Sequence, residues 1–149
     1  MIQFMKYCIA GGVATLTHIV LFHFIAWKIF PALQKSDAAV ILFNLQVTQV
    51  DVVTRSFNSM LSNGITFIFS NLVAYIANIY FVFESGRHSK LVEISLFYLV
   101  SGISMIIGTG IMGFLIRFFG MQTTIAFSAN IVTAVLINYS IRKFFIFKG

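Results

Sequence analysis

The sequence predicts an all-α, polytopic membrane protein with four transmembrane helices. Hydrophobic residues make up 59% of its 149 residues and charged residues only 9%, whereas a soluble domain carries about 25% charged residues. The apolar residues are gathered in four long runs, and the four carboxylates lie in or near the segments that connect them. The runs cover roughly residues 7–30, 60–83, 91–119 and 123–147.

Each run is long enough to cross the hydrocarbon layer of a bilayer, which is about 30 Å thick and needs about 20 helical residues. A helix buried in a soluble core would be shorter and would show a polar face. The first run follows Lys6 and contains no small-residue cleavage pattern before Trp27. We therefore interpret it as a retained span and not as a signal peptide.

The connection between the first and second runs is unusually long and is expected to form an extracytoplasmic insertion over about residues 31–59. Pro31 ends the first span, and Asp37 is a candidate helix cap. Residues 38–53 are apolar but are interrupted by amides and a carboxylate, so the segment is too polar and too short to span. An interfacial or re-entrant helix and a β-like excursion rich in valine both remain open.

Basic residues lie in ones and twos at the ends of the runs, and their distribution predicts the topology. One side of the membrane holds Lys6, Arg87, Lys90, Arg142, Lys143 and Lys148, and the other holds Lys28, Lys35, Arg55 and Arg117. The positive-inside rule then places both termini in the cytoplasm. The net charge of +6 is not gathered on one polar face, which excludes a typical nucleic-acid-binding surface.

The two halves of the chain resemble each other. The segment 7–11 aligns with 98–102, since each opens a span with tyrosine and has glycine four positions later. The segment 81–83 aligns with 145–147, since each closes a span with Phe-x-Phe. We expect a single domain, residues 1–149, built from two helical hairpins with the same orientation, as in a parallel repeat. The one cysteine, Cys8, cannot form an intrachain disulfide.

These motifs resemble those of the GtrA-like family of small four-span membrane proteins. The opening is Lys6-Tyr7-Cys8-Ile9-Ala10-Gly11-Gly12, and the closing motifs lie at 78–83 and 138–147. The usual ending in that family is Asn, three residues, Asn, a basic residue, one residue and Phe-x-Phe. Here Ala74 and Ile79 depart from the first ending, and Arg142 replaces the second Asn of the last.

The resemblance implies translocation of a polyprenyl-phosphate-linked sugar, of the undecaprenyl phosphate type, across the bacterial inner membrane for cell-surface polysaccharide glycosylation. The alternative is a non-transporting subunit that anchors or organises a glycosyltransferase. A small multidrug exporter is disfavoured because the first span holds no carboxylate. We expect no enzyme activity, cofactor or metal, since no catalytic constellation or phosphate-binding glycine loop is present. Four spans enclose little volume, so we expect a homo-oligomer among membrane lipids.

A polar ridge is predicted on the last span, where Asn130, Ala134, Asn138 and Arg142 recur at every fourth residue. An amide that faces lipid tails has no hydrogen-bond partner, which costs about several kcal/mol in hydrocarbon. The ridge therefore either holds helices together or forms a polar path for a headgroup. On the second span Asn71 and Asn78 share a face and are the expected partners, whereas Asn63 lies well round the helix.

Two histidines lie in the first span. His18 shares a face with Gly11 and Thr15 and is assigned to the polar path, and His23 lies nearer the outer half. Their spacing of five does not suit a metal pair. A neutral histidine bonded between helices is the simpler interpretation.

A lipid phosphate would be bound by cations at the cytoplasmic ends of the spans. The candidate headgroup-binding residues are Lys6, Arg87, Lys90, Arg142 and Lys143. Arg142 is the strongest candidate because it also lies on the polar ridge. The same cations would serve orientation and attraction to anionic lipids.

Overall fold

A computed structural model describes residues 2–81 and 90–141. This part of the chain is helical, with no strand. Its helices are α1 (Ile2–Lys28), α2 (Ala38–Phe43), α3 (Val52–Phe81), α4 (Lys90–Phe119) and α5 (Thr123–Ile141). The predicted all-helical class is confirmed for these residues, and the predicted end of the last span, at 147, lies outside them.

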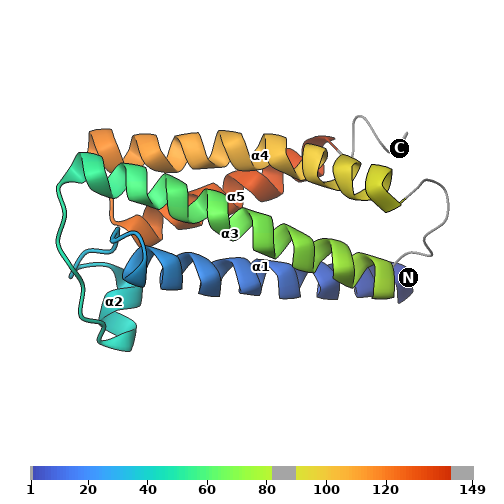
Figure 1. Cartoon of the computed structure of the whole chain (residues 1–149), viewed down its shortest axis with the longest axis horizontal. Coiled ribbons are helices and arrows are strands. Elements are labelled where there is room, and N and C mark those ends of the chain that lie inside the picture. Colours follow the sequence, from blue (N-terminus) through green and yellow to red (C-terminus); the bar gives the residue numbers. More distant parts are fainter. Residues whose placement is uncertain (1, 82–89, 142–149) are drawn as a thin grey trace.

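The four long helices lie side by side, and each runs antiparallel to the next along the chain (Figure 1). Helix α1 packs on α3, α3 on α4, and α4 on α5. The start of α1 and the end of α5 lie at one end of the bundle, which we call the terminal end; α2 and its flanking segments cover the opposite end, the loop end (Figure 1). The predicted four-span and repeat arrangement stays a prediction.

Among the described residues, three helices are long and apolar enough to span a membrane: Ile9–Lys28, Val52–Ala77 and Phe97–Phe119. A shorter apolar segment, Thr123–Ala134, lies in α5. Large apolar side chains on all four long helices point outward, such as Leu16 (63% exposed) on α1 and Leu136 (60%) on α5. Such a surface is stable against lipid tails and not in water, so the chain is a membrane protein.

The insertion is shorter than the predicted 31–59, because α3 begins at Val52 and not near residue 60. Asp51 starts the helix: its Oδ1 accepts hydrogen bonds from the backbone N–H groups of Val53 and Thr54, at 2.9 and 3.0 Å. The segment contains a six-residue helix, α2, which ends where Asn44 adopts a left-handed conformation with φ 48°. Arg55, Ser56 and Ser59, which the sequence places in the insertion, are buried side chains in the first turns of α3.

The bundle is packed unevenly along its length. An apolar core lies in the half nearer the loop end and includes Phe22, Ala26, Met112, Ile116 and Phe127. In the other half, the described side chains of α3 after 71, of α4 before 104 and of α5 after 130 are all at least partly exposed. On α1, Ala10 and Ala14 are buried there. The terminal half is thus the more open part of the bundle.

Candidate functional site: a buried polar network

A stripe of small polar side chains runs along α3 and faces the interior. Its members recur at intervals of three and four residues, which keeps them on one face of a helix. All are at most 5% exposed: Ser56, Ser59, Asn63, Thr66 and Ser70. Because unpaired polar groups are costly in hydrocarbon, this stripe can only be stable between helices, and it dictates which face of α3 is buried.

Asn63, which is fully buried, is the centre of a hydrogen-bond network that joins four helices. Its Nδ2 donates to Thr109 Oγ1 on α4 at 2.6 Å. Its Oδ1 accepts from Asn130 Nδ2 on α5 at 3.1 Å and lies 2.9 Å from His18 Nε2 on α1. One amide thus holds α1, α4 and α5 around α3, near the middle of the bundle.

His18 is fixed by α3 at both ring nitrogens. Because Asn63 Oδ1 can only accept, the neutral imidazole donates from Nε2 and accepts at Nδ1 from the hydroxyl of Ser70, 2.7 Å away. Among the described residues no carboxylate takes part in this network, so it links neutral groups. Its chemical capacity is hydrogen bonding to uncharged donors and acceptors, not acid–base catalysis with a carboxylate partner.

Asn130 reaches Asn63 through a gap left by glycine. A methyl group on Gly108 of α4 would lie 2.1 Å from Asn130 Oδ1 and 3.2 Å from the Asn130 carbonyl oxygen. Real Cβ atoms essentially never approach an oxygen as closely as 2.1 Å, so the absence of a side chain at residue 108 leaves the space in which the Asn130 amide lies between α4 and α5.

Aromatic rings connect α1 and α5 beside the network. Phe22 and Phe127 stack face to face with their ring centroids 3.8 Å apart. His18 stacks parallel to Phe127 at 5.6 Å, and His23 meets the same ring edge-on at 5.4 Å. Both phenylalanines are almost completely buried, so they close the loop-end side of the network.

Several buried polar atoms have no hydrogen-bond partner within the described part of the chain. They are His23 Nε2, Arg55 Nε, Ser62 Oγ, Thr66 Oγ1, Asn71 Nδ2 and Thr124 Oγ1. Each is a group that a bound polar molecule could satisfy. No group of three or more His, Cys, Asp or Glu side chains suited to a metal ion occurs in residues 2–81 and 90–141.

A second polar cluster closes the loop end. Asp37 is buried, and its two oxygens accept from the backbone N–H groups of Gln34, at 2.6 Å, and Thr124, at 2.7 Å. The hydroxyl of Thr123 donates to the carbonyl oxygen of Ala32. Arg55 donates to the Met121 carbonyl oxygen at 2.7 Å and interacts electrostatically with Asp37. These bonds attach the insertion to the start of α5.

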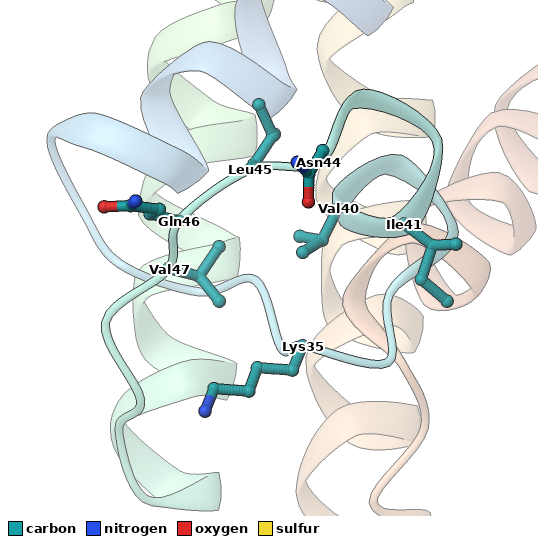
Figure 2. A pocket seen from close by; sticks show the side chains of 7 residues that line it. All are labelled: Lys35, Val40, Ile41, Asn44, Leu45, Gln46 and Val47. Atoms are coloured by element: carbon teal, nitrogen blue, oxygen red, sulfur yellow. The ribbon is translucent and has the colours of Figure 1, made fainter.

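An open hollow of about 510 Å³ lies outside this cluster, on the loop end. Figure 2 shows its lining, which comes from the segment before α2, from α2 itself and from the extended segment after it. The lining residues are Lys35, Val40, Ile41, Asn44, Leu45, Gln46 and Val47. Nearby, the indole N–H of Trp27 donates to the Gln46 carbonyl oxygen at 2.7 Å, which ties this segment to the end of α1.

The predicted polar-path residues do not all lie in the network. His18 and Asn130 lie in the network, while Asn71 is buried directly after Ser70 on α3. The side chains of Asn78 and Asn138 lie outside the described part. Asn130 bonds to Asn63 and not to the expected face of Asn71 and Asn78, because the Asn63 face of α3 is the one turned to α5.

None of the predicted headgroup-binding side chains belongs to the described part of the structure. Lys6 lies in the first turns of α1 and Lys90 is the first residue of α4, so both backbones are at the terminal end. Arg87, Arg142 and Lys143 lie outside the described residues altogether. Their assignment to a lipid phosphate stays a prediction.

Sequence reasoning missed Asn63, Ser70 and Thr109 as network residues. The signal was the spacing of 56, 59, 63, 66 and 70, which is as regular as the ridge on the last span. Serine and threonine at this spacing carry the same signal as the amides, and the first turns of the stripe lie within the range 31–59 that the sequence assigns to the insertion.

The fold and the network define a class: a helical membrane protein whose long helices are joined by neutral polar side chains in their interior. The particular family follows from comparison with known proteins. The family model for the GtrA/DPMS transmembrane domain matches residues 6–147, and the chain belongs to this family. No curated protein and no solved structure matches the chain.

Proposed function

We propose that this protein translocates a polyprenyl-phosphate-linked sugar across the bacterial inner membrane, for glycosylation of cell-surface polysaccharide. Its family ties the chain to polyprenyl-phosphate sugar metabolism in membranes and consists generally of non-catalytic proteins. The proposal adds that the sugar-phosphate headgroup crosses the membrane while the prenyl tail stays in lipid. No bond is made or broken.

The observation that carries the proposal is the buried network around Asn63. A sugar phosphate cannot cross hydrocarbon without polar partners, since each unpaired polar group there is costly. The network provides hydroxyl, amide and imidazole groups from four helices. These groups can exchange their mutual hydrogen bonds for bonds to sugar hydroxyls, so that the headgroup always has partners.

The uneven packing of the bundle supports entry from the terminal end. Described side chains of α3, α4 and α5 in that half are at least partly exposed, whereas the loop-end half is closed by the apolar core and by Asp37. With both termini in the cytoplasm, the headgroup would first meet the predicted cations near Lys6 and Lys90 and then the network. A homo-oligomer would enclose the path more fully than one bundle does.

A second candidate function is a non-transporting subunit that organises a glycosyltransferase. The three hydrogen bonds of Asn63 to other helices favour it, because side-chain hydrogen bonds of this kind can serve only to hold a membrane bundle together. This candidate predicts co-purification with an enzyme and no headgroup movement by the protein alone.

Reconstitution in liposomes separates the two functions. The assay measures access of an externally added reagent to a labelled polyprenyl-phosphate sugar in the inner leaflet, with and without protein. We expect protein-dependent access, and a large loss with Asn130→Ala. Ser128→Ala is the matched control on the same helix, since its hydroxyl is exposed and bonds only to the Thr124 carbonyl oxygen. Binding of the lipid without access to it would favour the organising subunit. A strict monomer that remains active would refute the homo-oligomer.

A further inference from the structure

The contact between α1 and α5 differs from the contacts that join α1 to α3, α3 to α4 and α4 to α5. Close backbone packing joins α1 to α3, α3 to α4 and α4 to α5, whereas α1 and α5 make little backbone contact. Their contact, which we call the α1–α5 seam, is made by the rings of Phe22, Phe127, His18 and His23. The bundle is therefore closed along this line by side chains.

Within the described residues, no side-chain hydrogen bond connects α1 directly to α5 in this seam. His18 bonds to α3, and Asn130 also bonds to α3. The stacked pair Phe22–Phe127 is held by dispersion, which has no strict directional requirement. Parting the rings breaks no hydrogen bond between α1 and α5, while the bonds of Thr123 and Thr124 to the insertion hold the loop end of α5 in place. The seam can therefore open at the level of the rings without loss of a hydrogen bond.

Two unpartnered polar atoms flank the ring pair on its loop-end side, one on each helix. His23 follows Phe22 on α1, and Thr124 lies one turn before Phe127 on α5. His23 Nδ1 lies 2.9 Å from the Ile19 carbonyl oxygen, which can only accept, so Nδ1 carries the proton and Nε2 is a free acceptor. Thr124 Oγ1 is buried without a partner and can donate or accept.

We propose that the α1–α5 seam is a lateral gate for the lipid-linked headgroup, with Phe22 and Phe127 as its closing pair. His23 Nε2 and Thr124 Oγ1 receive the sugar once the rings part. An acceptor on one helix and a hydroxyl that can donate or accept on the other suit the hydroxyl groups of a sugar. The prenyl tail stays outside, among exposed apolar side chains of both helices such as Val20 and Val132. This inference rests on the proposed function and adds where the headgroup passes.

The test is to bridge the seam reversibly. Phe22→Cys and Phe127→Cys are combined in a Cys8→Ser background and joined by a bifunctional methanethiosulfonate of short span. The matched control bridges α3 to α4 through Phe67→Cys and Tyr98→Cys, whose native ring centroids lie 5.9 Å apart. We expect the first bridge to slow headgroup access at least tenfold and a reducing agent to restore it, with the control bridge changing it less than twofold. Full activity of the bridged seam, or equal loss in both bridged proteins, would overturn the gate.

A second measurement keeps the rings in place and does not depend on translocation. Spin labels at the exposed positions 20 and 132 report the distance between α1 and α5. We expect the distance to widen when a polyprenyl-phosphate sugar is added and not when the free polyprenyl phosphate, which lacks the sugar, is added. An unchanged distance with both lipids overturns the gate. Failure of the wild-type protein to move any headgroup instead overturns the proposed function, even where the labels show opening.

Discussion

The amide of Asn130 on α5 lies against Gly108 of α4, in space that only a residue without a side chain leaves free. The amide oxygen of Asn130 occupies the space that a side chain at residue 108 would need, with a separation of only 2.1 Å to the position of a Cβ atom. The same amide donates to Asn63. The packing of two helices and the polar network are thus one structural unit.

Gly108→Ala should therefore damage both packing and network. We expect a loss of about 2 kcal/mol in the free energy of unfolding, as for other overpacked positions, measured by SDS titration in bicelles. The matched control is Gly110→Ala, where an added Cβ meets nothing within 4 Å. Equal stability of the two variants would show that α4 and α5 can separate without cost at residue 108.

Asn63→Leu should destabilise the bundle more than Asn71→Leu. Asn63 makes hydrogen bonds to three helices, and Asn71 Nδ2 has no partner in the described part of the chain. Side-chain hydrogen bonds in membranes average about 0.6 kcal/mol each, so we expect a loss of about 2 kcal/mol for Asn63→Leu. The same unfolding titration measures both variants. A larger loss with Asn71→Leu would mean that Asn63 is not the centre of the network.

Asp37→Ala should loosen the loop end. The substitution leaves the N–H groups of Gln34 and Thr124 without their acceptor and removes the carboxylate near Arg55. Hydrogen bonds to a charged group contribute about 1.5–3 kcal/mol each, and we expect a loss of about 3 kcal/mol in thermal or SDS unfolding. Asp37→Asn should be intermediate, because it keeps one oxygen. Ser36→Ala, at the exposed residue before Asp37, is the control. A comparable loss of stability in that variant would rule out a specific role for Asp37.

Asp51 should give a small, pH-dependent contribution to stability. The hydroxyl and the backbone N–H of Thr54 bond to its carboxylate and hold the pKa of Asp51 below its ordinary value. Because the pKa of Asp51 is lower in the folded than in the unfolded protein, the stabilisation is complete at pH values above the unfolded-state pKa, about 3.9. It is lost as the pH falls through the folded-state pKa. Wild type and Asp51→Asn should thus differ at pH 6 and converge in strong acid. A difference that does not change with pH would exclude this mechanism.

Arg142→Ala should weaken binding of a polyprenyl-phosphate sugar more than Arg117→Ala. Loss of a charge-assisted hydrogen bond to phosphate corresponds to about a tenfold loss of affinity. Arg142 lies outside the described residues but on the predicted ridge, whereas Arg117 is exposed near the end of α4 at the loop end. Flotation of the protein with liposomes that contain the lipid gives the affinities. Equal and negligible effects would remove the headgroup assignment.

The helical class of this protein was predictable because membrane spans have a strong signal. Long apolar runs can satisfy their backbone only as helices or barrels, and Pro31 marks the end of α1 to within a few residues. The sequence places the start of α3 too late because Arg55, Ser56 and Ser59 are polar, as residues between membrane spans usually are. They are buried because neighbouring helices supply their partners, which a local pattern does not reveal.

The candidate site was only partly visible in the sequence. His18 and Asn130 stood out because histidine and asparagine are conspicuous among apolar residues. Their actual partners depended on the rotation of α3, which is set by contacts with residues 45 to 67 positions away. Helical periodicity shows which residues share a face but not which helix that face meets.

Because Asn63 is the centre of the network, its partners become available in a fixed order as the chain is synthesised. Its partner on α1, His18, has already left the ribosome when Asn63 emerges, while Thr109 and Asn130 follow 46 and 67 residues later. The hairpin of α1 and α3 can therefore provide the Asn63 amide with a partner before the rest of the chain is made. The hairpin of α4 and α5 then adds the two remaining hydrogen bonds. We therefore expect His18 to be the first of the three partners that Asn63 meets as the chain enters the membrane.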